Sequence, residues 1–246
     1  MSTPGDNSYG EIWAPYYDDI FPDVDHSAID LLEGFARPSM RALELAIGTG
    51  RVALPLAARG VSVTGIDNSD RMLDVLRAKP GGESIALLTG DLAEVDIAGE
   101  WPLIYLPFNT LFILTTQQRQ VECFQNVATH LESGGRFVLD TFVPDMKRWD
   151  EQNTRMGVSS ISSDTAHAYE MTIHHPIEQK NVSHMVRRLE SGESVVLPVT
   201  IRYVWPSEMD LMARLAGLVL EDRWGWYDRR PFNDRSGQHV SVYRKP

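Results

Sequence analysis

Apolar residues recur along this chain in short runs, and amphipathic segments separate the runs. Five runs predict β-strands, near residues 42–47, 61–66, 84–88, 103–106 and 135–142. Between them, apolar residues at helical spacing predict helices near 51–59, 69–78 and 117–131. Strands that alternate with helices are typical of a parallel sheet covered on both faces. The pattern therefore predicts an α/β fold.

Further elements are predicted at both ends of the chain. Short helices at residues 13–21 and 27–36 precede the first strand and form an N-terminal helical cap over residues 1–38. Near the other end, a helix at 206–216 is followed by two strands that pair as an antiparallel hairpin. These strands are predicted at residues 218–227 and 239–244.

Between residues 144 and 205 the pattern changes to alternating segments rich in Ser, Thr, Val and His. Four antiparallel strands are predicted here, at Met156–Ser163, Ala168–His175, Val182–Leu189 and Val195–Tyr203. The stretch is too long to be a loop. We therefore interpret residues 144–205 as a β-rich insertion into a core made of residues 39–143 and 206–246.

A glycine loop follows the first predicted strand. Gly48-Thr49-Gly50 interrupts an apolar run, a helix follows, and the next apolar run ends in Asp67. Strand, glycine loop, helix and strand form a nucleotide-binding unit, in which glycine lets the backbone approach a ligand closely. The acid at the end of the second strand can accept both hydroxyls of a ribose. The sequence therefore predicts a ligand with an adenosine-like end.

The identity of the nucleotide depends on Glu44. The loop taken alone also satisfies the dinucleotide pattern G-x-G-x-x-G/A. A carboxylate inside the preceding strand is costly unless it faces a cation or a hydrogen-bond donor. The ammonium group of a methionine moiety is such a partner. A pyrophosphate is negatively charged and would repel the carboxylate. Glu44 therefore favours a methionine-bearing nucleotide over a dinucleotide.

Glu44 and Asp67, on either side of the loop, resemble the first two motifs of the class I S-adenosylmethionine-dependent methyltransferases. Ala46 takes the place of the first of the three glycines in that pattern. Three later segments are also similar to the family, namely Gly90-Asp91-Leu92, residues 101–112 and the glycine-led strand 134–140. The segments Pro107–Thr110 and Ser236–Lys245 are most similar to the branch that methylates small natural-product scaffolds and amino sugars.

The resemblance implies a Rossmann-like fold with a mainly parallel seven-stranded sheet, and S-adenosylmethionine as the cofactor. It places the methionine end at Gly48 and Gly50, its ammonium at Glu44 and the ribose at Asp67. The other residues that we predict to contact the cofactor are Tyr16, Ala46, Thr49, Asn68, Met72, Asp91, Leu92 and Leu106. Tyr16 belongs to an N-terminal aromatic cluster with Tyr9, Trp13 and Tyr17, for which packing between cap and core is the alternative.

Methyl transfer asks little of side chains, since an enzyme gains mainly by aligning the acceptor and excluding water. A general base is needed only if the acceptor arrives protonated. The candidates that we single out are His174, His175, Tyr105 and Asn109, with His184 and Asp140 as further possibilities. Two adjacent residues on a strand face opposite sides, so only one of His174 and His175 can point into a given site. Asn109 and Asp140 also have purely structural interpretations.

Composition and charge indicate which classes of partner to expect. The chain of 246 residues has a net charge of −11 and no basic stripe, so we expect no nucleic acid as substrate. It has one cysteine, Cys123, and its polar start lacks the apolar segment of a signal, so we expect a cytoplasmic protein with no membrane association. Zinc-site spacings are absent, so no metal is predicted.

These observations predict a methyltransferase that acts on O or N of a small, specialised metabolite. The insertion is expected to cover the acceptor site, and a dimerisation sheet in a homodimer is the alternative. Two other functions stay open. One is a nicotinamide-dependent oxidoreductase, and the other is a family member that binds the cofactor without transferring a methyl group.

Overall fold

Two β-sheets organise the fold, which is described here from a computed structural model for residues 8–94, 97–160, 167–189 and 191–246. The main sheet has seven strands in the order β10-β11-β5-β4-β1-β2-β3. The strands are β1 (Arg41–Leu45), β2 (Ser62–Asp67), β3 (Ala86–Thr89), β4 (Trp101–Leu106), β5 (Leu131–Phe142), β10 (Val219–Trp224) and β11 (Gln238–Arg244). Strands β1 to β5 are mutually parallel, and β11 runs antiparallel between β5 and β10. The predicted α/β architecture is confirmed.

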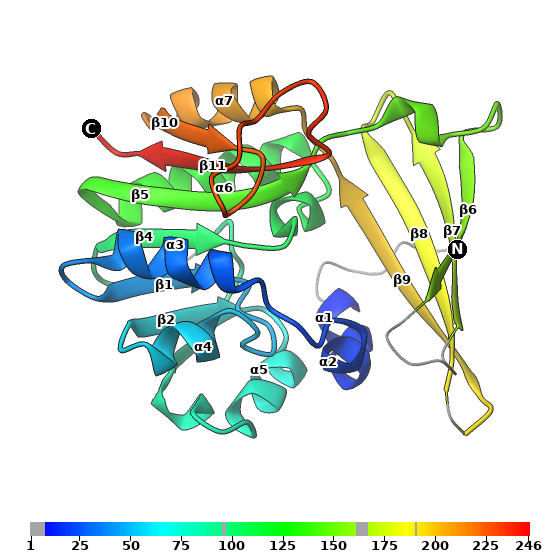
Figure 1. Ribbon diagram of the computed structural model, residues 1–246, viewed down its shortest axis with the longest axis horizontal. Coiled ribbons are helices and arrows are strands. Elements are labelled where there is room, and N and C mark those ends of the chain that lie inside the picture. Colours follow the sequence, from blue (N-terminus) through cyan, green and yellow to red (C-terminus); the bar gives the residue numbers. More distant parts are fainter. Residues whose placement is uncertain (1–7, 95–96, 161–166, 190) are drawn as a thin grey trace.

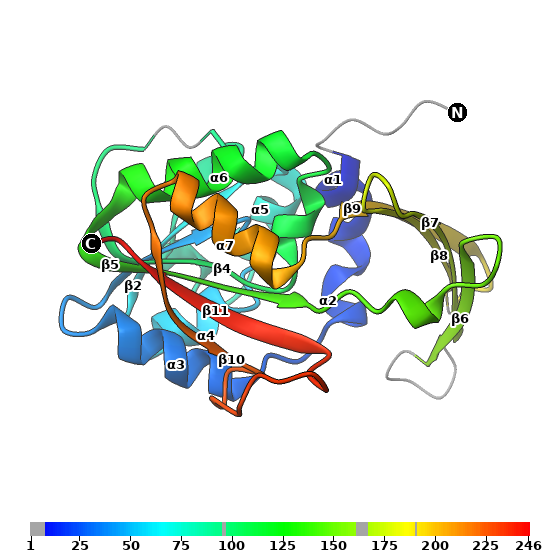
Figure 2. The same ribbon diagram turned by 90° about the horizontal axis from the view of Figure 1, so that it is seen from above.

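Helices cover both faces of the main sheet (Figure 2). The helices on one face are α3 (His26–Ala36), α4 (Ala53–Ala58) and α5 (Asp70–Arg77), which pack on one apolar core. The opposite face carries α6 (Gln117–His130) and α7 (Pro206–Leu215), which pack on a second core. Short 3-10 turns occur at Gly82–Ser84 and Thr110–Ile113. Within the described residues, no helix has both the length and the apolar character needed to cross a membrane.

The insertion forms a separate antiparallel sheet beside the main one (Figure 1). Its strands, in the order β6-β7-β8-β9, are β6 (Thr154–Ser160), β7 (His167–His175), β8 (Lys180–Arg188) and β9 (Ser194–Arg202). A 3-10 turn at Met146–Arg148 lies between β5 and β6. The predicted strand over residues 156–163 corresponds to β6, and its residues 161–163 lie outside the described part of the chain.

A buried polar network joins the insertion to the core. Arg202, at the end of β9, donates to Gln120 of α6 at 2.6 Å and pairs with Glu208 of α7 at 2.7 Å. Its side chain is only 7% exposed. A buried guanidinium must be paired to be tolerated, so these contacts hold the end of β9 against α6 and α7.

The N-terminal segment lies between the two sheets (Figure 1). It consists of α1 (Ser8–Trp13), a 3-10 turn (Ala14–Tyr16) and α2 (Tyr17–Ile20). The Trp13 side chain packs with Met72 of α5 and Leu197 of β9, and its indole Nε1 donates to the Pro198 carbonyl at 2.9 Å. This segment therefore fills the space between the glycine loop's side of the core and the insertion.

Several element boundaries differ from the prediction, and two of the differences have a clear physical cause. The single helix predicted over residues 13–21 is three short pieces, because Pro15 lacks an N–H and cannot sit within a continuous helix. Strand β5 begins at Leu131, four residues before the predicted start at residue 135, because Leu131 pairs with Trp101 of β4 and the Gly134 amide donates to the Lys245 carbonyl. That partner is more than a hundred residues away in the sequence.

Candidate functional site

The glycine loop leaves β1 at the carboxyl edge of the main sheet. The strand order switches between β1 and β4, because β2 and β3 follow on one side of β1 while β4 and β5 lie on the other, and ligands of open α/β sheets bind at this point. Ala46, Gly48 and Gly50 all have left-handed backbone, with φ values of 51°, 56° and 79°. A Cβ on Gly50 would lie 2.8 Å from Cγ of Leu76, so only glycine fits there. A Cβ on Gly48 would meet nothing nearer than the Ala46 carbonyl oxygen at 4.0 Å, so there is room for a ligand beside this backbone.

Asp67 closes the loop from the end of β2. Its carboxylate accepts the Gly48 amide at 2.8 Å and the Ser69 amide at 2.9 Å. Burial raises the pKa of Asp67, and these two amides act against that rise. Each carboxylate oxygen has a second lone pair, so the side chain can still accept hydroxyl groups.

Glu44 lies in the middle of the sheet, and its register partner on β4 is Tyr105. The Tyr105 hydroxyl donates to the Glu44 carboxylate at 2.7 Å, and both side chains are buried. No ion pair between described residues includes Glu44. Burial raises the pKa of Glu44 to about 8. A buried carboxylate without a cation is costly, so the site is suited to a ligand that brings a positive charge.

A second buried carboxylate, Asp140 of β5, fixes the loop after β4. It accepts the Phe108 amide at 2.7 Å and the Tyr227 hydroxyl at 2.6 Å. Phe108 and Asn109 are both left-handed, with φ values of 65° and 59°. Asn109 Oδ1 accepts the Phe142 amide at 2.6 Å. Asp140 and Asn109 therefore shape the loop in this structure, in line with their structural interpretations.

The N-terminal segment covers this edge. The hydroxyls of Tyr9 and Tyr17 lie within range of the charges on Arg51 and Asp67, and burial raises the pKa of Tyr17 to about 12. The predicted cofactor set contains Tyr16 and neither of these two residues. All three tyrosines pack at the margin of the apolar cluster around Trp13. Tyr9 and Tyr17 therefore join Tyr16 as candidates for the cofactor site.

Polar contacts hold the N-terminal segment in place. Thr49 donates to the Asp18 carboxylate at 2.6 Å, and Lys79 pairs with the same group at 2.6 Å. At the other end, Ser69 donates to Glu11 at 2.7 Å. The Thr49 hydroxyl is therefore bonded to α2. Only the backbone of Thr49 remains for its predicted contact with the cofactor.

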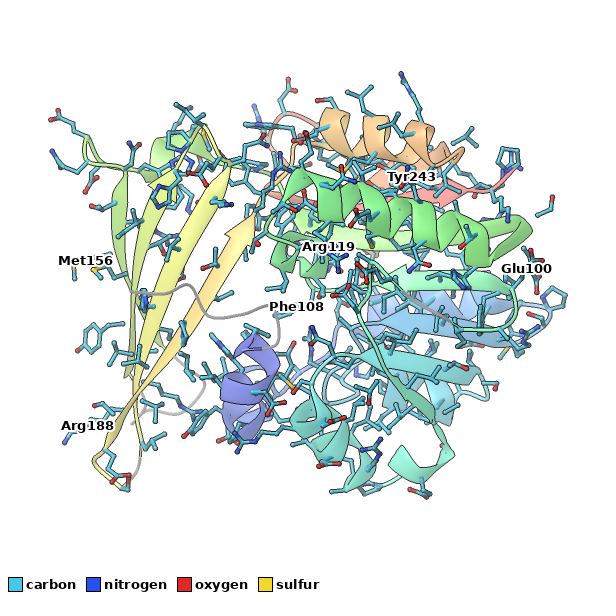
Figure 3. All side chains as sticks on the ribbon, turned by 180° about the vertical axis from the view of Figure 1, so that it is seen from behind. Glu100, Phe108, Arg119, Met156, Arg188 and Tyr243 are labelled. Atoms are coloured by element: carbon cyan, nitrogen blue, oxygen red, sulfur yellow. The ribbon has the colours of Figure 1, made fainter. Side chains whose placement is uncertain are left out.

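An aromatic stack closes the same side. Phe108 lies edge-on to Phe21 at 4.8 Å, and the Arg51 guanidinium lies 4.1 Å from the Phe108 ring. Figure 3 shows Phe108 where the main sheet, the N-terminal helices and the insertion meet. Phe108 lies two residues after the end of β4, and Arg51 directly follows the glycine loop after β1.

The remaining residues that we predict to contact the cofactor differ in their burial and in their contacts. Asp91 pairs with Arg119 at 2.7 Å and accepts the Ala93 amide at 2.7 Å, while Leu92 packs at the margin of the core. Leu106 is fully buried at the end of β4. Asn68 follows Asp67 directly and is half-buried, whereas Met72 packs under Trp13 in the N-terminal cluster.

The two adjacent histidines face opposite sides of the insertion sheet. His174 is buried, stacks on Trp149 at 4.5 Å, and its Nε2 lies 2.9 Å from the Tyr203 hydroxyl. Burial lowers the pKa of His174, so the ring is neutral near pH 7. His175 is exposed on the outer face, which argues against His175 as a catalytic residue. Tyr105 is also an unsuitable base, because its hydroxyl is buried and already bonded to Glu44.

The comparisons with known proteins agree with this geometry. Residues 42–135 match the methyltransferase domain family. The structure of the CcbJ methyltransferase from Streptomyces caelestis has a TM-score of 0.88 and 34% sequence identity, covering 98% of this chain and 99% of that one. The chain belongs to the class I S-adenosylmethionine-dependent methyltransferases.

Two further relatives are more distant. The amino pentose methyltransferase CalS10 from Micromonospora echinaspora, solved with S-adenosylmethionine bound, shares the fold with a TM-score of 0.68 and 19% identity, covering 90% of this chain and 91% of that one. The cypemycin N-terminal methyltransferase of Streptomyces sp is 24% identical over 205 residues, which are 82% of each chain.

The residues of this methyltransferase fit the cofactor of its family. The Glu44 carboxylate can receive the ammonium, the open backbone at Gly48 can lie against the methionine moiety, and Asp67 has lone pairs for ribose hydroxyls. Sequence reasoning missed Arg51 and Tyr227. Arg51 directly follows Gly50, where the apolar spacing predicts the start of a helix. Tyr227 lies 87 residues from Asp140, and nothing in its local sequence indicates that partner.

Proposed function

We propose that this methyltransferase transfers a methyl group to an amine nitrogen of a small, specialised metabolite. The choice of nitrogen over oxygen rests on the candidate general bases at the carboxyl edge of the main sheet. The oxygens of Tyr105, Asn109 and Asp140 are all engaged in hydrogen bonds within the protein. An unprotonated amine has a free lone pair and needs no base at the transfer step, whereas a hydroxyl does.

In this proposal the cofactor is held at the glycine loop. Glu44 binds the ammonium, Gly48 and Gly50 allow the backbone to approach the methionine end, and Asp67 binds the ribose. Asn68, Asp91 and Leu92 border the adenine, and Leu106 lies under the methionine. Tyr9, Tyr16 and Tyr17 cover the site from the N-terminal segment.

S-adenosylmethionine supplies a methyl group that its sulfonium already activates. The chain's own contribution is to orient the acceptor and to exclude water. Asp140 fixes the loop that carries Phe108, and the stack of Phe21, Phe108 and Arg51 covers the edge. These residues therefore position the acceptor and do not take part in proton transfer.

The acceptor lies under the insertion in this proposal. A cavity between the inner face of the insertion sheet and the segment after β5 reaches Phe142 at the end of β5. A cavity of about 200 Å³ is large enough for a compact molecule and too small for a macromolecule. The net charge of −11 likewise supports a substrate other than nucleic acid.

A direct assay tests the proposal. The protein is incubated with methyl-deuterated S-adenosylmethionine and matched pairs of small scaffolds that carry either an amine or a hydroxyl at one position, and products are followed by mass spectrometry. Label on the amines alone supports the proposal. Label on the hydroxyls alone contradicts it and points to His174, the buried neutral imidazole, as the base of an O-methyltransferase.

Calorimetric titration separates the open alternatives. S-adenosylhomocysteine should bind and a nicotinamide dinucleotide should not, because Glu44 would face the pyrophosphate. Binding of S-adenosylhomocysteine together with no product across the panel favours a family member without transfer activity.

The homodimer also remains a prediction. The outer face of the insertion sheet exposes several apolar side chains, among them Met156 at 80%, Tyr169 at 56% and Val196 at 53%. Figure 3 shows Met156 pointing away from the rest of the molecule. Native mass spectrometry of the protein and of a Met156→Glu variant tests whether this face joins two copies.

A further inference from the structure

The cavity under the insertion has an unusual lining. Its volume is about 200 Å³, which is far more than a single water molecule needs. One wall is the inner face of the insertion sheet, with Arg155, Glu170 and Asn181. The other wall is aromatic and includes Trp149 and Tyr203.

Two buried polar atoms at this cavity have no hydrogen-bond partner among the described residues. They are Oδ1 of Asn181, an acceptor, and Nε1 of Trp149, a donor. A buried polar group that makes no hydrogen bond loses free energy that a partner would restore. The pair therefore indicates a ligand that can both donate and accept.

Two side chains of opposite charge, Arg155 and Glu170, also line the cavity, and they form no ion pair with each other. Glu170 on β7 is the register partner of Gly157 on β6, and Arg155 lies two residues before Gly157 on the same face. Among the described residues, the ion pairs include neither Arg155 nor Glu170. Glu170 has one weak contact, in which the Thr172 hydroxyl donates at 3.4 Å.

The set of donors and acceptors decides which ligand chemistry fits. The donors of the lining are Arg148, Arg155 and Trp149, and the acceptors are Asp145, Glu170 and Asn181. A purely cationic ligand would leave the donors unmatched, and a purely anionic one would face Glu170. A hydroxyl group donates and accepts at once, so several hydroxyls on one ring match the whole set.

We infer that this cavity is a subsite of the acceptor pocket that binds a hydroxyl-rich ring, such as a glycosyl group, through Arg155, Glu170 and Asn181. This inference rests on the proposed function, because it places a non-reacting part of the acceptor. Trp149 and Tyr203 offer flat apolar surface to the C–H face of such a ring. Phe142 lies at the cavity, and its amide donates to Asn109 at 2.6 Å, so the subsite adjoins the loop that borders the transfer site.

Saturation-transfer NMR on the protein saturated with S-adenosylhomocysteine tests this inference. The probes are four methyl glycosides, of glucose, galactose, mannose and xylose. Their controls are 2-methoxytetrahydropyran, which has the ring without hydroxyls, cyclohexylamine and cyclohexanecarboxylate. We expect signal from at least one glycoside, and weak or no signal from the controls.

Variants locate the binding. Glu170→Ala and Asn181→Ala should each reduce the glycoside signal at least fivefold, Asn181→Asp should retain part of it because it keeps an acceptor oxygen, and Glu178→Ala, in the exposed turn after β7, should leave it unchanged. Calorimetry with S-adenosylhomocysteine checks that each variant is folded.

Three results would overturn the inference: no glycoside signal, signal that is unaffected by Glu170→Ala and Asn181→Ala, or a stronger signal from cyclohexylamine than from every glycoside. Failure of S-adenosylhomocysteine itself to bind would instead overturn the proposed function, so the two failures are distinguishable.

Discussion

The hydroxyl of Tyr105 donates a hydrogen bond of 2.7 Å to the carboxylate of Glu44, and the two residues are register partners on adjacent central strands. Burial raises the pKa of Glu44 to about 8, although this hydrogen bond acts against the rise. In the free protein near pH 7, the Glu44 carboxyl is therefore mostly protonated. Its ionisation is linked to the arrival of a cation.

Ligand binding should release a proton from Glu44. The ammonium of S-adenosylhomocysteine favours the carboxylate and lowers its pKa, so close to one proton leaves at pH 7. Calorimetry in phosphate and in Tris, which differ in ionisation enthalpy, should give different binding enthalpies. The Glu44→Gln variant should show no such difference. Equal enthalpies for the unmodified protein in both buffers would contradict this assignment.

Glu44→Gln should also change how stability depends on pH. The folded-state pKa of about 8 lies above the ordinary value of 4.5. Between these pH values the carboxyl ionises in the unfolded chain but not in the folded protein, so the free energy of unfolding falls as pH rises. At about 1.4 kcal/mol per pKa unit, the effect at pH 8 reaches a few kcal/mol. In thermal unfolding without ligand, the stability of Glu44→Gln relative to the unmodified protein should increase from pH 5 to pH 8. A constant difference across this range would refute the argument.

Asp67→Ala should weaken S-adenosylhomocysteine binding by about 2–3 kcal/mol, since two charge-assisted hydrogen bonds to the ribose are lost. The variant also releases the Gly48 and Ser69 amides, so circular dichroism must show an intact fold. Asp74→Ala is the matched control, because Asp74 is exposed and, within the described part of the chain, its carboxylate forms an ion pair only with its helix neighbour Arg77. Unchanged affinity in Asp67→Ala would exclude this residue from the cofactor site.

Gly10→Ala should detach the N-terminal segment. A Cβ at residue 10 would lie 2.3 Å from Cβ of Ser69, so α1 cannot keep its place on the loop after β2. We expect faster hydrogen exchange in α1 and at least tenfold weaker S-adenosylhomocysteine binding. Gly34→Ala, on the exposed face of α3 with open space around it, should instead stabilise the protein by about 0.5–1 kcal/mol. Normal affinity in Gly10→Ala would show that the segment does not contact the cofactor.

Arg202→Ala should cost about 3–5 kcal/mol of unfolding free energy, because it removes the guanidinium that pairs with the partly buried Glu208 and the fully buried Gln120. The surface pair Arg136–Glu221 provides the comparison, and Arg136→Ala should cost about 1 kcal/mol or less. Urea unfolding measures both. Similar losses in the two variants would mean that the buried network does not anchor the insertion.

The sequence by itself determined the features that depend on neighbouring residues. Apolar spacing along the chain predicted strands β1 to β5 and the antiparallel insertion, because side-chain periodicity is a local property of strands and helices. The glycine loop and its flanking acids were also readable, since the turn requires left-handed backbone at Gly48 and Gly50, and Asp67 ends the next strand.

The tertiary structure alone decided which side chains meet across the fold. Tyr105 reaches Glu44 over 61 positions of sequence and Tyr227 reaches Asp140 over 87, and the local pattern at each residue gives no sign of its partner. It also decided that His174 faces inward and His175 outward, because a strand's period of two says that they differ but not which one faces the core. These contacts depend on how segments that are distant in the sequence pack together, and that packing exists only in the folded chain.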